Sequence, residues 1–269
     1  MPILKEVFGE REATAMLRAL GEDLELNGIP FSHLAKNDQE TLLSSAVDKV
    51  IQGIPLQFIT GKACFYGRFF ELNENVLIPR PETEELVYYA LQKIPKGKKL
   101  NILDVGTGSG CIAISMALER PDISVYALDI CPKALKLARK NADHLGATNV
   151  KFVESDFLND ESWFSHLPQF DFLLSNPPYI SKGEAAVMSK STIEKEPALA
   201  LFAPDEDVLA FYRQISDLLP VLMKQGGFVF MEINEFRSQE TLDLFSNKVD
   251  RVEVIKDMQS KDRFIELQL

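Results

Sequence analysis

From Leu100 to the C-terminus, the chain alternates between short apolar segments and longer segments with helical periodicity. Segments such as Asn-Ile-Leu-Asp-Val and Asp-Phe-Leu-Leu-Ser are almost continuously apolar, which is typical of parallel strands covered on both faces. The alternation predicts an α/β fold with a doubly wound, mostly parallel sheet and right-handed crossovers. Helices are expected to begin near Cys111, Pro132 and Val208. Seven strands are predicted, at residues 101–105, 124–128, 150–154, 170–175, 228–233, 251–257 and 263–267.

The N-terminal part of the chain has a different pattern. Apolar residues recur at helical spacing in residues 5–20 and again in residues 38–51. β-type residues punctuated by glycines follow at 58–59 and 65–72, which predicts a hairpin. We therefore expect two units, a small helical domain with a β-hairpin bridge at residues 1–73 and the α/β domain at residues 74–269.

A glycine-rich loop follows the first predicted strand of the α/β domain. It reads Asp104-Val-Gly-Thr-Gly-Ser-Gly110 and leads directly into an apolar helix. Glycines allow a sharp turn and bring bare backbone against a ligand, and a helix N-terminus offers free N–H groups. No lysine directly follows the last glycine of the loop, where the sequence has Cys111, and this excludes a Walker-type phosphate loop. The candidate ligand-binding residues in this loop are Gly106, Thr107, Gly108, Ser109 and Gly110.

Two further candidates stand at the ends of the next two strands. Asp129 ends the second strand, where a carboxylate can accept hydrogen bonds from both ribose hydroxyls of a nucleoside. Phe157 follows the third strand, where an aromatic ring can cover one face of an adenine. Asp129 has the alternative role of capping the helix that starts at Pro132, and Phe157 that of a core residue.

The fourth strand ends in Ser175-Asn176-Pro177-Pro178-Tyr179. Two successive prolines fix φ and remove two backbone donors, so this turn is rich in acceptors. An amide nitrogen is a poor nucleophile, but its two N–H groups can donate to the Asn176 side chain and to the Pro177 carbonyl while Tyr179 packs on the flat amide. Holding a nitrogen in this way can supply several kcal/mol of barrier lowering without a strong base. The turn therefore predicts an enzyme that acts on a planar nitrogen, with Asn176, Pro177 and Tyr179 as its catalytic residues.

Over nearly its whole length the chain resembles the release factor glutamine methyltransferases. The segment Ile78-Pro-Arg-Pro-Glu-Thr-Glu84 is more specific than the glycine loop or the Asn-Pro-Pro-Tyr turn, which alone indicate only an enzyme acting on a planar nitrogen. The other matching segments are Pro55-Leu-Gln-Phe-Ile-Thr-Gly61, Phe65-Tyr-Gly67, Ser155-Asp-Phe157, Glu196-Pro197 and Phe211-Tyr-Arg213. Two departures are Glu232-Ile-Asn234, where the family often has a glycine after Glu-Ile, and residues 203–207, where it has a glycine-rich run.

The resemblance implies a Rossmann-like methyltransferase fold and S-adenosyl-L-methionine as the cofactor. It implies that residues 106–110, Asp129, Phe157 and Asn176 contact the cofactor. It also implies that Asn176, Pro177, Pro178 and Tyr179 hold the glutamine of a Gly-Gly-Gln motif in a peptide chain release factor, which the helical N-terminal part helps to grip.

The net charge of the chain bears on the alternative functions. The formal net charge is −11 and the pI is about 4.9, which disfavours nonspecific binding to nucleic acid. A DNA or RNA adenine-N6 methyltransferase, the rival enzyme, needs a basic region and must flip its base. The sequence has a basic run at Lys93, Lys96, Lys98 and Lys99, so this rival stays open. A non-catalytic scaffold that binds S-adenosylmethionine is the second rival. We expect a protein substrate and no direct nucleic-acid substrate.

The remaining residues point to no metal site and to a cytoplasmic protein. The three histidines are scattered, and the three cysteines form no Cys-x-x-Cys pair, which suits a reducing compartment. The sequence shows no signal peptide and no run of roughly 20 apolar residues, so no membrane partner is expected. Arg80 and Glu82 have two roles open to them, as a lid over the cofactor or as part of a helix start.

Overall fold

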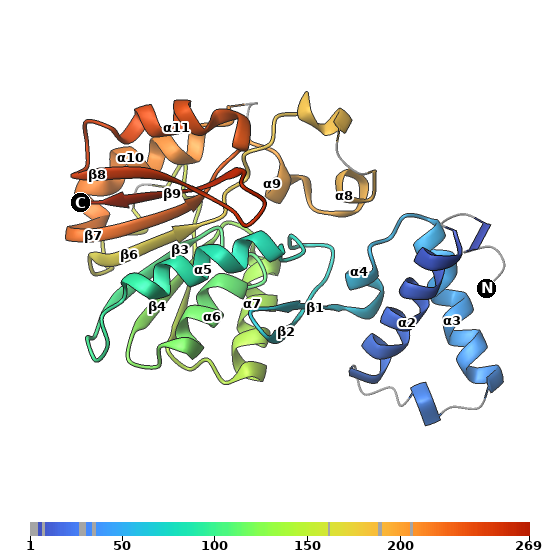
Figure 1. Cartoon of the computed structure of the whole chain (residues 1–269). Coiled ribbons are helices and arrows are strands. Elements are labelled where there is room, and N and C mark those ends of the chain that lie inside the picture. The colour runs from blue at the N-terminus through green and yellow to red at the C-terminus, as the bar shows by residue number, and fades with distance from the viewer. Residues whose placement is uncertain are drawn as a thin grey trace.

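The computed structural model describes residues 5–6, 9–26, 31–33, 36–160, 162–187, 190–204 and 207–269. Parts of the predicted helix at residues 5–20 and of the departure at residues 203–207 lie outside these ranges. Within them, the chain forms a large α/β unit and a smaller helical unit joined by a two-stranded hairpin (Figure 1).

A seven-stranded sheet forms the centre of the α/β unit, as the sequence predicted. Its spatial order is β5-β4-β3-β6-β7-β9-β8. The strands from β5 to β7 run parallel, whereas β9 is antiparallel to both β7 and β8. The bounds are β3 Asn101–Val105, β4 Ser124–Asp129, β5 Val150–Glu154, β6 Phe170–Ser175, β7 Met223–Glu232, β8 Arg251–Lys256 and β9 Asp262–Gln268.

Helices cover both faces of this sheet, because side chains of successive residues in a strand point to opposite faces. On β3, Ile102 packs into the core beneath α5 Pro81–Lys93, α6 Cys111–Glu119 and α7 Pro132–Leu145. Its neighbour Leu103 packs into the opposite core, beneath α10 Ala210–Leu222 and α11 Ser238–Phe245 (Figure 1). Both faces of the central strands β3, β4 and β6 are therefore buried, as their continuous apolar sequences predicted, whereas the edge strand β5 is only partly buried.

Short helices connect the larger elements. They are the 3-10 turns η1 Phe31–His33, η2 Glu184–Val187 and η4 Glu235–Arg237 and the helices α8 Lys190–Lys195 and α9 Ala198–Leu201. None of the helices in the described part of the chain combines the length and apolar character that a membrane span requires.

The N-terminal unit contains α2 Glu10–Leu26, α3 Lys36–Ile51 and α4 Leu56–Thr60. The first two confirm the predicted helices. The prediction of β-type structure at residues 58–59 was wrong, because both residues lie in α4. Pro55 stands before this helix, and its carbonyl accepts hydrogen bonds from the amides of Phe58 and Ile59. Gly61 ends the helix in the left-handed conformation with φ 73°. These local turn contacts outweigh the β-propensity of Phe and Ile.

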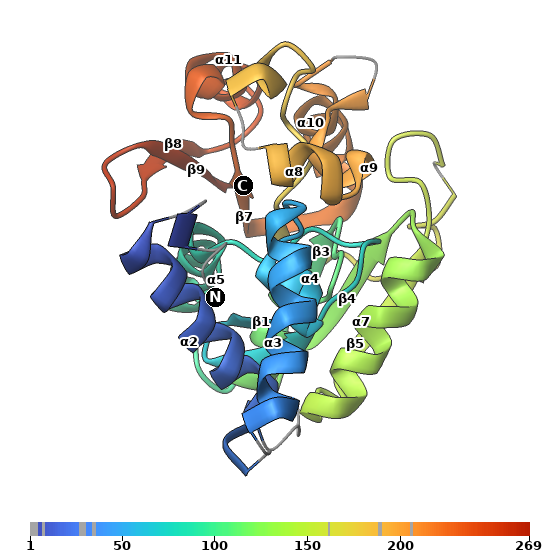
Figure 2. The same cartoon turned by 90° about the vertical axis from the view of Figure 1, so that its right-hand side faces the viewer.

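The hairpin of β1 Lys62–Phe65 and β2 Arg68–Glu71 packs against the α/β unit. Phe65 and Phe70 are fully buried in the same core as α5 and α6. The Asn141 amide of α7 bonds both backbone groups of Glu71 and also donates to the Ser109 carbonyl, so it links the hairpin to the glycine loop. Figure 2 shows the N-terminal helices nearest the viewer, and Figure 1 shows the hairpin between them and the sheet. The division of the chain at residue 73 stays a prediction.

Gly110 is the glycine of the loop that packing requires. A Cβ built there would lie 2.7 Å from Ile114 Cδ1 and 3.2 Å from Ala138 Cβ, and its φ is +84°. Gly146, at the end of α7, has a similar φ of +79° but open space around the same position.

We expect Gly110→Ala to lower the free energy of unfolding by about 1–3 kcal/mol more than Gly146→Ala does, because only the first adds overlap in a packed core. Both variants share the strain of a left-handed non-glycine residue. Denaturant unfolding of the two variants measures the difference. Equal losses would contradict the assignment of Gly110 to packing.

Candidate active site

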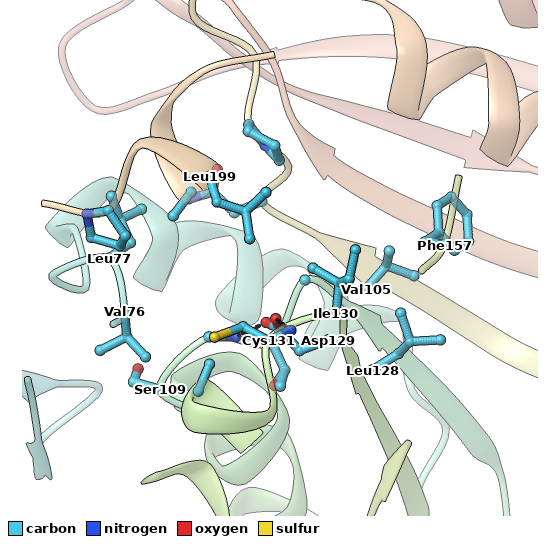
Figure 3. A pocket seen from close by; sticks show the side chains of 18 of the residues that line it. Val76, Leu77, Val105, Ser109, Leu128, Asp129, Ile130, Cys131, Phe157 and Leu199 are labelled. Atoms are coloured by element: carbon cyan, nitrogen blue, oxygen red, sulfur yellow. Dashed lines mark hydrogen bonds between the residues drawn. The ribbon is translucent and has the colours of Figure 1, made fainter. Parts of the chain in front are cut away.

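A cavity of about 350 Å³ lies at the carboxyl ends of the parallel strands (Figure 3). Because β3 is hydrogen-bonded to β4 on one side and to β6 on the other, the loops that follow these strands meet there. Open α/β sheets bind ligands at this edge. The candidate residues that line the cavity are Gly106, Thr107, Gly108, Ser109, Asp129, Phe157, Asn176 and Pro178.

The glycine loop lines this cavity with its backbone. Gly106 and Gly108 have φ values of 76° and 53°, and no atom within 4 Å would meet a Cβ at either. The loop is held from beneath by Asp104, whose Oδ2 accepts from the Thr107 hydroxyl at 2.6 Å and from the Ala113 amide at 3.1 Å. Full burial raises the pKa of Asp104 to about 7. Asp104 therefore joins the loop to the start of α6.

Gly110 does not line the cavity, although the sequence placed it among the ligand-binding residues. It lies beneath the loop against Ile114 and Ala138. The glycine at this position lets α6 and α7 pack closely, and its contact with a ligand stays a prediction.

Asp129 projects to the cavity from the end of β4. Its Oδ2 accepts from the Gly108 amide at 2.8 Å and its Oδ1 from the Cys131 amide at 2.9 Å. Burial raises the pKa of this carboxyl, and the two amides oppose that shift. A carboxylate has about four acceptor positions, so each oxygen can accept one more hydrogen bond. Asp129 therefore holds the backbone just before α7, whose N-cap residue is Cys131 and which has no side-chain cap, and it keeps acceptor positions for a ligand.

Phe157 takes the core role, and its expected contact with an adenine stays a prediction. It lines the cavity but is only 3% exposed. Its ring stacks on Phe211 at 6.0 Å with an interplanar angle of 5°, and lies 5.9 Å from Trp163. Trp163, for which the sequence suggested no role, supports the wall of the cavity from behind.

Two segments cover the cavity on the side away from the sheet. Val76 and Leu77 come from the loop before α5, and Leu199 comes from α9 (Figure 3). An ion pair joins the segments, since Arg80 Nη2 lies 2.7 Å from Glu196 Oε1 and Glu196 Oε2 accepts from the Ile78 amide. Arg80 also stands directly before α5, which confirms that this segment starts a helix, and its role as a lid over the cofactor stays a prediction.

The turn of residues 176–179 separates this cavity from a second one of about 240 Å³. Pro178 lines the first cavity, and Pro177 and Tyr179 line the second. Asn176 lines both. A group held in the second cavity at Asn176 therefore faces a ligand in the first.

The second cavity contains a buried carboxylate that the sequence did not identify. Glu232, at the end of β7, is 3% exposed and accepts from the Tyr179 hydroxyl at 2.8 Å. Burial raises the pKa of both groups, and for Tyr179 the nearby carboxylate raises it further. Tyr179 thus stays protonated and is held in place as a donor.

Asn234, the family departure noted in the sequence, supports the same turn. Its Nδ2 donates to Glu184 Oε1 at 2.9 Å and to the Tyr179 carbonyl at 3.4 Å, and its Oδ1 accepts from the Phe236 amide. An asparagine can make these contacts where a glycine has no side chain to do so. Among the described residues, no group of three or more His, Cys, Asp and Glu is placed to hold a metal ion.

The lining of the first cavity fits S-adenosyl-L-methionine. Asp129 has the two free acceptor positions that two ribose hydroxyls need, and Val105, Leu128 and Phe157 form an apolar wall for an adenine (Figure 3). The backbone of the glycine loop lies open for close approach. The fold and this site define a methyltransferase that uses S-adenosylmethionine.

Comparison with known proteins narrows the class. A family model described as a methyltransferase domain matches residues 96–266. The release factor glutamine methyltransferase of Flavobacterium psychrophilum is 42% identical, over 79% of this chain and 75% of that protein. The enzyme of the same name from Bacillus anthracis is 35% identical, over 94% of this chain and 95% of that protein. The chain belongs to the release factor glutamine methyltransferases. A methyltransferase structure from Pyrococcus furiosus, 18% identical over 87% of this chain and 98% of that one, shares the fold with a TM-score of 0.55.

We expect Asp129→Ala to weaken S-adenosylmethionine binding by about 1–3 kcal/mol, because ribose hydrogen bonds to a charged acceptor are lost. Titration calorimetry measures the affinity. Asp171→Ala is the matched control, because Asp171 lies at the start of β6, at the end of the strands away from the cavity. This variant should leave the affinity unchanged. An unchanged affinity in the Asp129 variant would remove Asp129 from the binding site.

Proposed function

We propose that this protein transfers the methyl group of S-adenosyl-L-methionine to the side-chain amide nitrogen of the glutamine in the Gly-Gly-Gln motif of peptide chain release factors. The observation that carries this proposal is the position of Asn176, which lines both cavities at a turn that two prolines deprive of backbone donors. The glutamine side chain would enter the second cavity and the cofactor would occupy the first.

The residues of the turn act by position. The glutamine NH2 donates one hydrogen to Asn176 Oδ1 and the other to the Pro177 carbonyl, which places its nitrogen toward the first cavity. Pro178 supports the turn from the cofactor side, and Tyr179, anchored on Glu232, packs against the flat amide. Fixed acceptors that face a nitrogen on which positive charge develops stabilise the transition state without moving.

The cofactor is held by the residues that line its cavity. The backbone of residues 106–109 and the carboxylate of Asp129 would bind the ribose and methionine parts, with Phe157 beside the adenine. S-adenosylmethionine supplies an electrophilic methyl group on a sulfonium. Val76, Leu77 and Leu199 then exclude water from the reacting atoms.

Several features favour a protein substrate over an adenine in DNA or RNA. Lys96, Lys98 and Lys99 precede β3, so they lie at the edge of the sheet opposite to the cavities (Figure 1). Lys93 is paired with Glu266 at 2.7 Å. The basic run therefore does not border the site, and the net charge of −11 repels phosphates elsewhere. The N-terminal helices are free to contact the release factor.

We place the reaction in the cytoplasm. Cys64, Cys111 and Cys131 are free thiols, with Cys64 exposed, as a reducing compartment allows.

We expect the purified enzyme to transfer labelled methyl from S-adenosylmethionine to an intact release factor, at the glutamine of its Gly-Gly-Gln motif. Mass spectrometry locates the label. A release factor with that glutamine replaced by alanine, and duplex DNA, should both stay unlabelled. Methylation of the DNA with none on the release factor would refute the proposal and favour an adenine-N6 methyltransferase.

The matched enzyme control is Asn176→Ala. It should lower turnover by about 10²-fold or more, because one preorganised acceptor is lost, while cofactor affinity stays within a few-fold. Normal turnover in this variant would remove Asn176 from the mechanism even if the release factor is the substrate.

A further inference from the structure

A chain of hydrogen bonds runs from the Asn176 side chain into the protein interior. Asn176 Nδ2 donates to Thr83 Oγ1 at 3.1 Å, and Thr83 Oγ1 donates to Glu232 Oε2 at 2.8 Å. The second oxygen of Glu232 accepts from Tyr179. Thr83 is 2% exposed and Glu232 3%, so water has little access to either group.

The carboxylate sets the direction of every bond in this chain. An ionised Glu232 accepts hydrogen bonds and cannot donate them. Thr83 has one hydroxyl hydrogen, which it gives to Glu232, so its oxygen is left as an acceptor. Only the NH2 end of the Asn176 amide can satisfy that acceptor.

The groups that contact Glu232 hydrogen-bond its ionised form. Burial raises the pKa of this carboxyl overall and the charge of Glu82 adds to the rise, whereas the hydrogen bonds from Thr83 and Tyr179 and the Arg263 guanidinium oppose it. A charged group buried in this way is tolerated because both of its oxygens are hydrogen-bonded.

The amide of Asn176 is therefore held in one of its two possible orientations. With Nδ2 bound to Thr83, the Oδ1 atom lies at the other end of the amide, and no hydrogen bond within the described residues uses it. The opposite orientation would present an NH2 group to the NH2 of the substrate, where two donors face each other and no hydrogen bond forms.

We propose that Thr83, fixed by Glu232, is a positioning residue that orients the Asn176 amide so that its oxygen accepts from the substrate nitrogen. This inference rests on the proposed methyl transfer to glutamine. Thr83 lies in the first turn of α5, which starts at Pro81, and Glu232 ends β7. The helix α5, the strand β7 and the turn at residues 176–179 thus meet at the Glu232 carboxylate. The fold therefore determines which end of the Asn176 amide the substrate meets.

The test compares two variants with the wild type in the release factor assay. Thr83→Val has nearly the same shape but no hydroxyl, and we expect it to lower kcat about 10-fold or more with KM and cofactor affinity within a few-fold. Thr83→Ser keeps the hydroxyl and should stay within about three-fold of the wild type. If Thr83→Val does not fold, Thr83→Ala, which suits a helix, takes its place with the same expected loss.

Two controls separate positioning from stability. Thr241→Val removes another buried hydroxyl, that of a threonine in α11 which donates to the carbonyl of Arg237, the residue before this helix. This variant should leave kcat unchanged. In an Asn176→Ala background, Thr83→Val should cost little more, since its target is gone.

The outcomes are distinct. A wild type that does not methylate the release factor refutes the proposed function. An active wild type refutes the inference instead in any of three cases: if Thr83→Val keeps its kcat, if Thr83→Ser is as impaired as Thr83→Val, or if Thr83→Val costs as much without Asn176 as with it.

Discussion

The parallel pairing of β3 with both β4 and β6 is the constraint on which the site depends. It makes three strands end side by side, so loops that are distant in the sequence share one edge of the sheet. The glycine loop, Asp129 and Asn176 come from these three ends. Each loop then needs only a local device to aim its groups. Asp104 holds the glycine loop, two backbone amides hold Asp129, and two prolines hold the turn after β6.

A second constraint acts from inside the protein. Burial of an ionised carboxylate costs free energy unless its oxygens are hydrogen-bonded. Glu232 satisfies this need with Thr83 and Tyr179, and in doing so it joins α5, β7 and the turn at residues 176–179. Because Thr83 donates its hydroxyl hydrogen to Glu232, its oxygen accepts from Asn176 Nδ2, and Asn176 Oδ1 is left as an acceptor. The polarity at the mouth of the second cavity thus follows from a charge placed at the end of a central strand.

Much of this could be predicted from the sequence, because it depends on local patterns. Apolar runs identified the seven strands, and the glycine loop and the residues at strand ends identified the part of the cavity lining that lies at the edge of the sheet. The hydrogen-bond chain could not be predicted in this way. Thr83 and Glu232 are 149 residues apart, and a threonine in a helix start and a glutamate at a strand end are each ordinary in their local context. The helix α4 was misjudged for a related reason, since turn contacts at Pro55 and Gly61 decided it.

A crystal structure of the enzyme with S-adenosylhomocysteine and a release factor tests the account most directly. The account predicts the glutamine nitrogen between Asn176 Oδ1 and the Pro177 carbonyl, about 2.7–3.2 Å from each, facing the sulfur in the first cavity. A glutamine bound outside the second cavity, or an Asn176 whose NH2 group faces the glutamine nitrogen, would contradict it.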